Sequence, residues 1–185
     1  MRIVGGKFRG RAIAAPPGRD IRPTADRVRE SVFNILIHGK FEFHFNVARV
    51  LDCFAGTGAL GLEALSRGAL SVAFMDTDIK PCRANIDALD AGAETKLIRA
   101  DCLSPPGASE PCDLIFLDPP YNKGLAAPAL AALDKVGWIA DHAICVVELA
   151  AKENFDPPDD FVVVEERRYG AARVVLLVYN RTHAH

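Results

Sequence analysis

Two short motifs in this 185-residue sequence contain the residue types that a group-transfer site needs. One is a glycine-rich loop at residues 52–61 (DCFAGTGALG), which follows a short apolar run. The other is residues 118–121 (DPPY), which follow a second apolar run. Glycines let a ligand approach the backbone closely, and an acid followed by prolines and an aromatic ring offers fixed hydrogen-bond acceptors beside a flat surface.

The DPPY motif suits methylation of an amino group attached to an aromatic base. The lone pair of such an amine is delocalised into the ring, so the nitrogen is a poor nucleophile. The Asp118 carboxylate and the Pro119 carbonyl can hold its hydrogens and free the lone pair, while Pro119 and Pro120 fix the direction of that carbonyl. Tyr121 can stack on a base that is unpaired or extruded from its helix. The alternative is a tight turn that merely ends a strand.

The glycine loop predicts a nucleotide-like cofactor. Gly56, Gly58 and Gly61 form a G-x-G-x-x-G pattern, and Asp76 lies 18 residues beyond Gly58, so a nicotinamide dinucleotide must be weighed. A carboxylate at Asp52 would repel the pyrophosphate of that cofactor. S-adenosylmethionine instead carries a sulfonium and an ammonium group, which an acid attracts.

S-adenosylmethionine is therefore the favoured cofactor. Asp76 can accept hydrogen bonds from its ribose, and Asp101, after the third predicted strand, can accept one from its adenine amine. A tight strand-to-helix turn without a ligand is the remaining alternative.

The five cysteines do not indicate a metal site, because no Cys/His spacing resembles a zinc ligand set. Cys82 and Cys112 each follow a proline, as in carbon-5 pyrimidine methyltransferases. However, the position after the fourth predicted strand belongs to Asp118, so a cysteine nucleophile is disfavoured.

The elements that position both motifs alternate along the chain. Apolar runs predict strands at 48–53, 70–76, 96–99, 113–117, 143–149, 161–164 and 173–179, and helices are expected at 58–68, 79–90 and 124–135. Runs that are apolar throughout and separated by helices indicate a parallel sheet covered on both faces. The last two strands are joined by a short turn and should be antiparallel. The prediction is a doubly wound α/β sheet ending in a hairpin, with Asp52, Asp76 and Asp118 facing one crevice at the strands' carboxyl ends.

Residues 1–46 are predicted to form a basic extension of a main domain at 47–185. Residues 1–30 have a net charge of +5, against −7 for the other 155 residues, which suggests a polyanionic partner at one edge, although a solvated basic face fits the charge equally well. Glycines near residues 5–10 indicate a small hairpin, and residues 16–18 a linker. A helix follows, with an apolar stripe at Val28, Val32, Ile35 and Leu36; Arg27 and Arg29 fall off this stripe.

The composition is that of an ordinary globular domain, with 50% hydrophobic and 25% charged residues. No apolar run approaches the ~18 residues of a membrane span, and the start of the chain lacks a secretory signal. We therefore expect a soluble, cytoplasmic monomer.

The sequence resembles the bacterial 16S ribosomal RNA guanine-N2 methyltransferases of the RsmD type. The resemblance is carried by residues 2–11 (RIVGGKFRGR), 22–34 (RPTADRVRESVFN), 51–69 (LDCFAGTGALGLEALSRGA) and 118–121 (DPPY), with 137–140 (GWIA) further along. It implies a seven-stranded Rossmann-like methyltransferase sheet with an N-terminal hairpin extension. It also implies S-adenosylmethionine as cofactor and 16S ribosomal RNA in the small subunit as partner.

The expected site residues fall into three groups. The target-base group is Asp118, Pro119, Pro120 and Tyr121. The cofactor group is Asp52, Phe54, Ala55, Gly56, Gly58, Asp76, Thr77, Asp101 and Cys102. The RNA-binding group is Arg2, Lys7, Arg9, Arg11, Arg22, Arg27 and Arg29.

Three other functions remain open. A DNA adenine-N6 methyltransferase can use the same DPPY motif but usually carries a separate target-recognition region. A glutamine-N5 protein methyltransferase more often has Asn at the position of Asp118. A non-catalytic RNA-binding module would keep a degenerate cofactor pocket.

Overall fold

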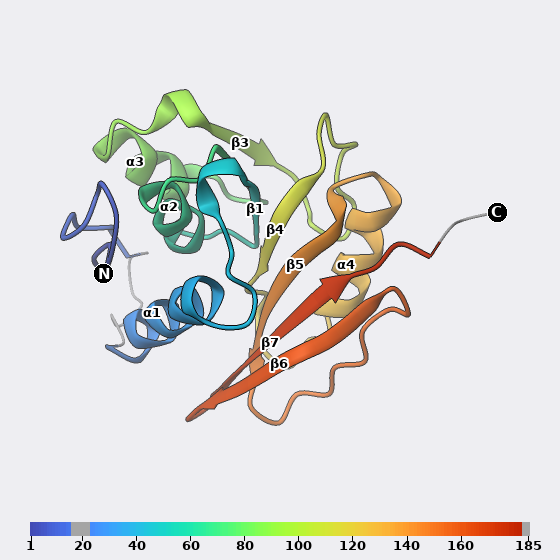
Figure 1. The fold of residues 1–185 in the computed structure, drawn as a ribbon. Helices are drawn as coiled ribbons and strands as arrows, with labels where there is room; N and C mark the ends of the chain where they lie inside the picture. Colours follow the sequence, from blue (N-terminus) through green and yellow to red (C-terminus); the bar gives the residue numbers. More distant parts are fainter. Residues whose placement is uncertain (16–22, 183–185) are drawn as a thin grey trace.

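The computed structural model describes residues 1–15 and 23–182. Its centre is a seven-stranded sheet in the order β3-β2-β1-β4-β5-β7-β6 (Figure 1). The strands are β1 (Arg49–Cys53), β2 (Ser71–Asp76), β3 (Thr95–Arg99), β4 (Cys112–Leu117), β5 (Ile139–Ala150), β6 (Phe161–Tyr169) and β7 (Ala172–Tyr179). β1 to β5 are parallel, and β7 is antiparallel to both β5 and β6. The predicted mostly parallel sheet with a C-terminal hairpin is confirmed.

Helices cover both faces of this sheet. They are α1 (Pro23–His38), α2 (Ala59–Ser66), α3 (Lys80–Ala88) and α4 (Ala126–Lys135), with short 3₁₀ turns at Phe45–Val47 and Gly92–Glu94. Alternate strand residues point to opposite faces. Val50 and Phe116 pack with α1, α2 and α3, whereas Leu51 and Ile115 pack with α4. The apolar strand runs follow from burial on both faces.

Two strands are longer than the apolar runs that predicted them. β5 begins at Ile139 rather than 143, because Ile139 already pairs with Cys112 before a register shift. β6 continues to Tyr169 rather than 164, although Glu165–Arg168 are charged, because each of these residues pairs with β7. Backbone pairing, which hydropathy does not reveal, therefore sets both lengths.

The predicted N-terminal hairpin is reduced to one bridge, between Arg2 and Ala12. It packs on helices rather than directly on the sheet. The Glu63 carboxylate of α2 accepts hydrogen bonds from the Val4 N–H (2.9 Å) and the Gly5 N–H (3.2 Å). Ile3 joins the same buried cluster as α1, α2 and the strands beneath them. The predicted linker at 16–18 lies outside the described residues.

α1 forms where the apolar periodicity predicts it. Val28, Val32 and Leu36 are buried and Ile35 is half-buried. Phe33, off the predicted stripe, is also fully buried and stacks on Phe45 with ring centroids 5.6 Å apart. The buried face is therefore wider than the stripe, because α1 is covered by both the sheet and the residue 41–47 segment.

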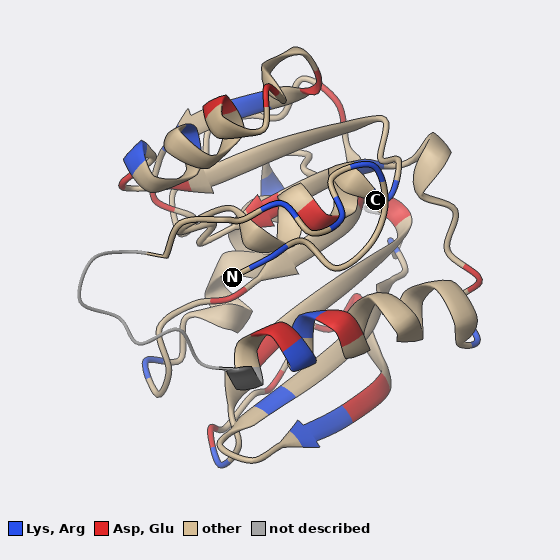
Figure 2. Ribbon diagram, turned by 90° about the vertical axis from the view of Figure 1, so that its left-hand side faces the viewer, with Lys and Arg blue, Asp and Glu red and all other residues tan. Residues whose placement is uncertain are grey.

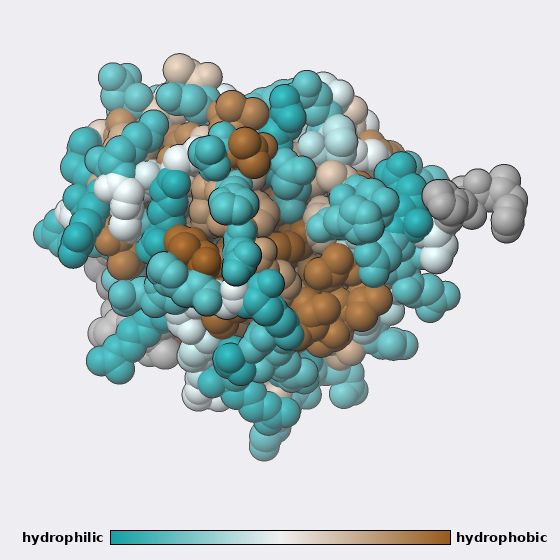
Figure 3. Space-filling view, viewed as in Figure 1, coloured by the Kyte–Doolittle hydropathy of each residue, from teal (hydrophilic) through white to brown (hydrophobic). Residues whose placement is uncertain are grey.

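Two features concern the outer surface. Among the described residues, no helix has the length and apolar character that a membrane crossing requires. Figure 3 shows hydrophobic side chains gathered over part of the strand region that α1 leaves uncovered. Val162 and Val163 of β6 are exposed hydrophobic residues.

Candidate active site

The sheet order brings both motifs to one edge. β2, β1 and β4 are neighbours, so the glycine loop after β1 lies between Asp76 at the end of β2 and the DPPY segment after β4. Two hydrogen bonds join these pieces. The Gly56 N–H donates to Asp76 Oδ2 at 2.9 Å, and the Asp118 N–H donates to the Cys53 carbonyl at 3.5 Å. Residues of both motifs therefore meet at the strands' carboxyl ends.

Glycine is required at the three loop positions for two different physical reasons. A Cβ on Gly61 would lie 2.4 Å from the Phe74 ring of β2, and one on Gly58 would lie 2.6 Å from Cys82 Sγ of α3, so these glycines allow the start of α2 to approach both elements. A Cβ on Gly56 would meet no atom within 4 Å, and its φ of +56° favours glycine. Gly56 is thus the loop glycine that leaves room for a ligand.

Asp52 does not present the exposed charge that the sequence argument assumed. Its side chain is 1% exposed, and Oδ2 accepts a hydrogen bond from the Gly61 N–H at 2.9 Å. Burial raises the pKa of this carboxyl to about 8, although the Gly61 hydrogen bond opposes the shift. That expectation was wrong because Asp52 points beneath the loop and fixes the first turn of α2.

The other cofactor candidates surround the loop. Asp76 is half-buried, and its Oδ1 accepts a hydrogen bond from the Asp78 N–H at 3.0 Å. Thr77 and Asp101 are exposed beyond β2 and β3, and the Leu103 N–H donates to Asp101 at 2.9 Å. These carboxylates have further acceptor positions for ligand hydroxyl or amine groups.

The loop backbone is strained at one residue. Phe54 is not a glycine but has a φ of +54°, and its N–H donates to Cys102 Sγ at 3.3 Å. Ala55 continues the loop, with its N–H bonded to the Met75 carbonyl at 3.2 Å. Such strain persists only where the surrounding structure holds it, and it is concentrated at functional sites. Cys102 is buried, so it supports the loop from below.

The DPPY segment alternates between exposed and buried residues. Asp118 and Pro120 are exposed and Pro119 is buried. Tyr121 is 37% exposed, and its hydroxyl donates to Glu148 Oε1 of β5 at 2.7 Å. The sequence analysis missed Glu148, although it is the one charged residue in the apolar run 143–149.

A second missed residue holds the loop that follows. Glu153 is 7% exposed and accepts hydrogen bonds from the Gly124 N–H (3.3 Å) and the Ala150 N–H (3.2 Å). Burial raises the pKa of Glu153, but hydrogen bonds from backbone N–H groups, including that of Asn122, lower it by more. The pKa of Glu153 therefore lies below its ordinary value. The sequence around Glu153 does not reveal its contact with Gly124, because that residue is 29 positions away in the chain.

The cysteines are free and buried. Burial raises the pKa of the Cys112 thiol to about 12 and that of Cys82 well above its ordinary value. A thiolate nucleophile at either position is therefore disfavoured, in line with the sequence argument.

Most of the expected RNA-binding side chains are exposed. The N-terminal segment contributes exposed Arg2, Lys7, Arg9 and Arg11. Figure 2 looks onto this segment, with α1 below it carrying both basic and acidic residues. Arg27 on α1 is also exposed, while Arg22 lies outside the described residues.

Arg29 corrects the sequence-based expectation. It is 4% exposed, and its guanidinium pairs with Glu63 at 3.5 Å and with Asp26 at 3.2 Å. It also donates to the Arg2 carbonyl. Arg29 therefore joins α1 to α2 and the N-terminal segment, and it cannot reach RNA phosphates from there.

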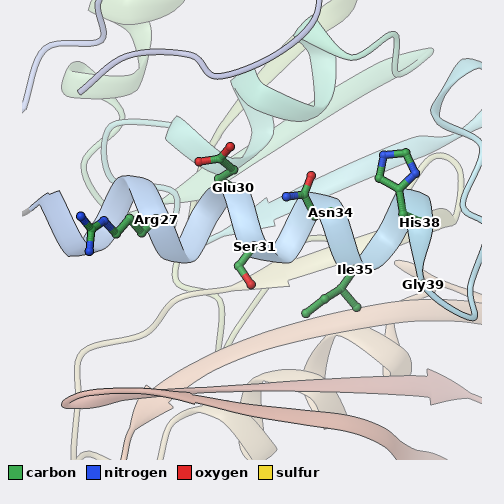
Figure 4. Close-up of a pocket in the computed structure, with 7 residues that line it drawn as sticks. All are labelled: Arg27, Glu30, Ser31, Asn34, Ile35, His38 and Gly39. Atoms are coloured by element: carbon green, nitrogen blue, oxygen red, sulfur yellow. The ribbon is translucent and has the colours of Figure 1, made fainter.

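One surface hollow lies on the outer side of α1 (Figure 4). It measures about 500 Å³ and is lined by Arg27, Glu30, Ser31, Asn34, Ile35, His38 and Gly39. It contains none of the candidate catalytic or cofactor residues, and it shares only Arg27 with the candidate RNA surface. We therefore place the chemistry at the strands' carboxyl edge rather than in this hollow.

A protein-family model described as "Conserved hypothetical protein 95" matches residues 1–178. This chain belongs to that family. Ribosomal RNA small subunit methyltransferase D of Escherichia coli strain K12 is 38% identical over 152 residues, covering 80% of this chain and 74% of that protein. The Haemophilus influenzae protein of the same name is 32% identical over 177 residues, covering 92% and 89%. The resemblance to RsmD-type methyltransferases is confirmed.

The fold of this chain is similar to that of solved methyltransferase structures. The Escherichia coli protein yhhF has a TM-score of 0.82 and 34% identity, covering 98% of this chain and 99% of that one. A Synechocystis magnesium protoporphyrin IX methyltransferase with bound SAM has a TM-score of 0.64 at 17% identity, covering 87% of this chain and 82% of that one, and it supports the fold alone. The Rossmann-like methyltransferase fold of this family member is thus confirmed.

Proposed function

We propose that this protein transfers a methyl group from S-adenosylmethionine to the exocyclic N2 amine of a guanine in 16S ribosomal RNA of the small subunit. The observation that carries the proposal is the meeting of the glycine loop, Asp76 and the DPPY segment at one sheet edge. Membership of a family whose curated relatives are named small-subunit methyltransferases supports the class of reaction and of RNA.

The loop's hydrogen bonds favour a cofactor without phosphate. In a dinucleotide site the loop and helix N–H groups bind pyrophosphate. Here the Gly56 N–H already donates to Asp76, and the Gly61 N–H to Asp52. These two N–H groups are therefore already occupied and are not available to a pyrophosphate. Asp76 and Asp101 retain acceptor positions for ribose and adenine, and Gly56 leaves space beside them.

The residues after β4 act on the amine. Bound S-adenosylmethionine supplies a methyl group whose carbon–sulfur bond breaks with its electron pair on sulfur as the amine nitrogen bonds to carbon. Asp118 and the Pro119 carbonyl accept hydrogen bonds from the two N–H groups of the amine and so direct its lone pair toward the methyl group. After methyl transfer, the nitrogen loses one proton to solvent. Tyr121 stacks on the extruded base.

Mass spectrometry tests this function directly. Purified protein, S-adenosylmethionine and small subunits from a strain lacking the gene should yield one N2-methylguanine in 16S ribosomal RNA. Methylated adenine in DNA would instead establish the adenine-N6 alternative. No measurable cofactor binding by calorimetry would favour a non-catalytic RNA-binding module.

A further inference from the structure

Glu148 is the unexplained polar residue nearest the candidate target-base site. Every other residue of 143–150 in β5 is buried and apolar, whereas Glu148 is half-buried and charged. The hydroxyl of Tyr121 donates to its Oε1 at 2.7 Å. An ionised carboxylate accepts about four hydrogen bonds, so this contact leaves acceptor positions available.

Strand register places Glu148 beside Asp118. β4 and β5 are parallel, and their last register partners are Leu117 and Val147. Asp118 directly follows β4, and Glu148 is the next residue of β5. Phe116 and Val146, two positions earlier, both face α1. If the register continues by one residue, the backbones of Asp118 and Glu148 lie about one strand spacing, ~5 Å, apart.

Two neighbouring acids suit one particular base edge. Two carboxylates on adjacent strands repel each other. A base whose edge carries two hydrogen-bond donors offsets this repulsion by bonding to both. Guanine presents N1–H and N2–H groups side by side. Adenine presents its amine beside N1, which is itself an acceptor and would face a carboxylate unfavourably.

We propose that Glu148 is a specificity-determining residue that accepts a hydrogen bond from the N1–H of the target guanine while Asp118 holds the N2 amine. Tyr121, bonded to the same carboxylate, then fixes the base plane between these contacts. This inference rests on the proposed function and names the residue that makes its site select guanine.

The test replaces the target guanine by 2-aminopurine, which keeps the N2 amine but has no N1–H. Small-subunit RNA is joined from two pieces to carry either base at the mapped position and is reconstituted into subunits. Wild-type protein should prefer guanine by at least ~10-fold in kcat/KM, the effect of one hydrogen bond to a charged group. Glu148→Gln, whose amide can donate to N1 of 2-aminopurine, should reduce that preference about 10-fold.

Two controls separate reading of the base from support of Tyr121. Tyr121→Phe removes the hydroxyl contact and should lower both rates while keeping the guanine preference. Glu148→Asp keeps a carboxylate and should keep the preference at a reduced rate. Thermal unfolding verifies that each variant is folded.

A guanine preference that is unchanged in Glu148→Gln, with both rates lowered equally as in Tyr121→Phe, would overturn the role of Glu148 in reading the base. A wild-type protein that methylates neither base would overturn the proposed function itself.

Discussion

At the scale of single residues, the acids of the site share a chemistry but differ in environment. Asp52 is buried, Asp76 is half-buried and Asp118 is exposed. The sequence indicates that all three lie near one crevice, but it does not reveal which one faces a ligand. Their environments differ because the loop after β1 folds over Asp52, whereas Asp118 follows β4 at the surface.

The buried carboxyl of Asp52 predicts a pH dependence of stability. Its folded pKa of about 8 lies above its ordinary 3.8, so the folded protein retains a proton that the unfolded chain loses between these values. Stability should therefore fall as pH rises through this window, by up to ~1.4 kcal/mol per pH unit.

The Asp52→Asn variant tests this prediction, because it keeps an acceptor for the Gly61 N–H and removes the charge. Urea unfolding at about pH 5 and about pH 8, without cofactor, should show the variant gaining on wild type as pH rises. A difference that is the same at both pH values would contradict the buried carboxyl.

Substitutions of Asp118 should reduce catalysis to different extents. Asp118→Ala should lower methyl transfer at least ~100-fold, the scale of losing a positioned electrostatic group, with cofactor affinity little changed. Asp118→Asn retains one oxygen acceptor and should lose less. Single-turnover rates and calorimetry with S-adenosylmethionine measure the two effects separately. Turnover that survives Asp118→Ala would remove this residue from the reaction.

At the scale of elements, α1 carries two nearby arginines in different environments. Arg29 forms a buried ion pair with Glu63, while Arg27 is exposed two residues earlier. Removing Arg29 should destabilise the protein by ~1–3 kcal/mol, because buried Glu63 loses one charged partner and keeps only the Arg67 guanidinium, 3.6 Å away. Arg27→Ala, the matched control, should change the unfolding free energy by less than ~0.5 kcal/mol. Denaturant unfolding of Arg29→Ala and Arg27→Ala compares them, and equal values would contradict the structural role of Arg29.

The N-terminal segment and α2 form a connected unit through side chains of the main domain. Glu63 bonds the backbone of residues 4 and 5, and Asn85 of α3 joins Ala14 to the Thr57 carbonyl of the glycine loop. The candidate RNA segment is thus attached to the helices that begin beside the cofactor loop. Sequence periodicity indicates these helices, but it does not indicate which of their polar residues hold another segment.

At the scale of the whole molecule, charge asymmetry predicts how RNA binding responds to salt. Each phosphate contact releases counterions and contributes ~0.7–0.9 to the slope of log affinity against log salt. Replacing Arg9, Arg11 and Arg27 by Ala should weaken RNA binding and reduce that slope. Lys135→Ala on α4, across the sheet, is the control and should leave the slope unchanged. Filter binding at several salt concentrations provides the measurement, and an unaltered slope in the triple variant would place the RNA elsewhere.

Much of the architecture is readable from local patterns. Apolar runs such as 113–117 locate the central strands, because a strand buried on both faces must be apolar along its length. The hairpin of β6 and β7 follows from the short turn between them. The lengths of β5 and β6 are not readable, since β5 runs through the polar Asp141–His142 stretch at a register shift, and Glu165–Arg168 join β6 by pairing with β7.

By itself, the sequence determined the sheet, the loop that follows β1 and the acid that follows β4, because these depend on residue order and hydrophobic periodicity. The tertiary structure alone decided that Asp52 and Arg29 are buried, that Glu148 contacts Tyr121, and that Glu153 holds the loop after the DPPY segment. The physical reason is that burial and hydrogen bonding between distant segments depend on which chain portions meet in space. Side-chain type limits what a residue can do there, but it does not fix its neighbours.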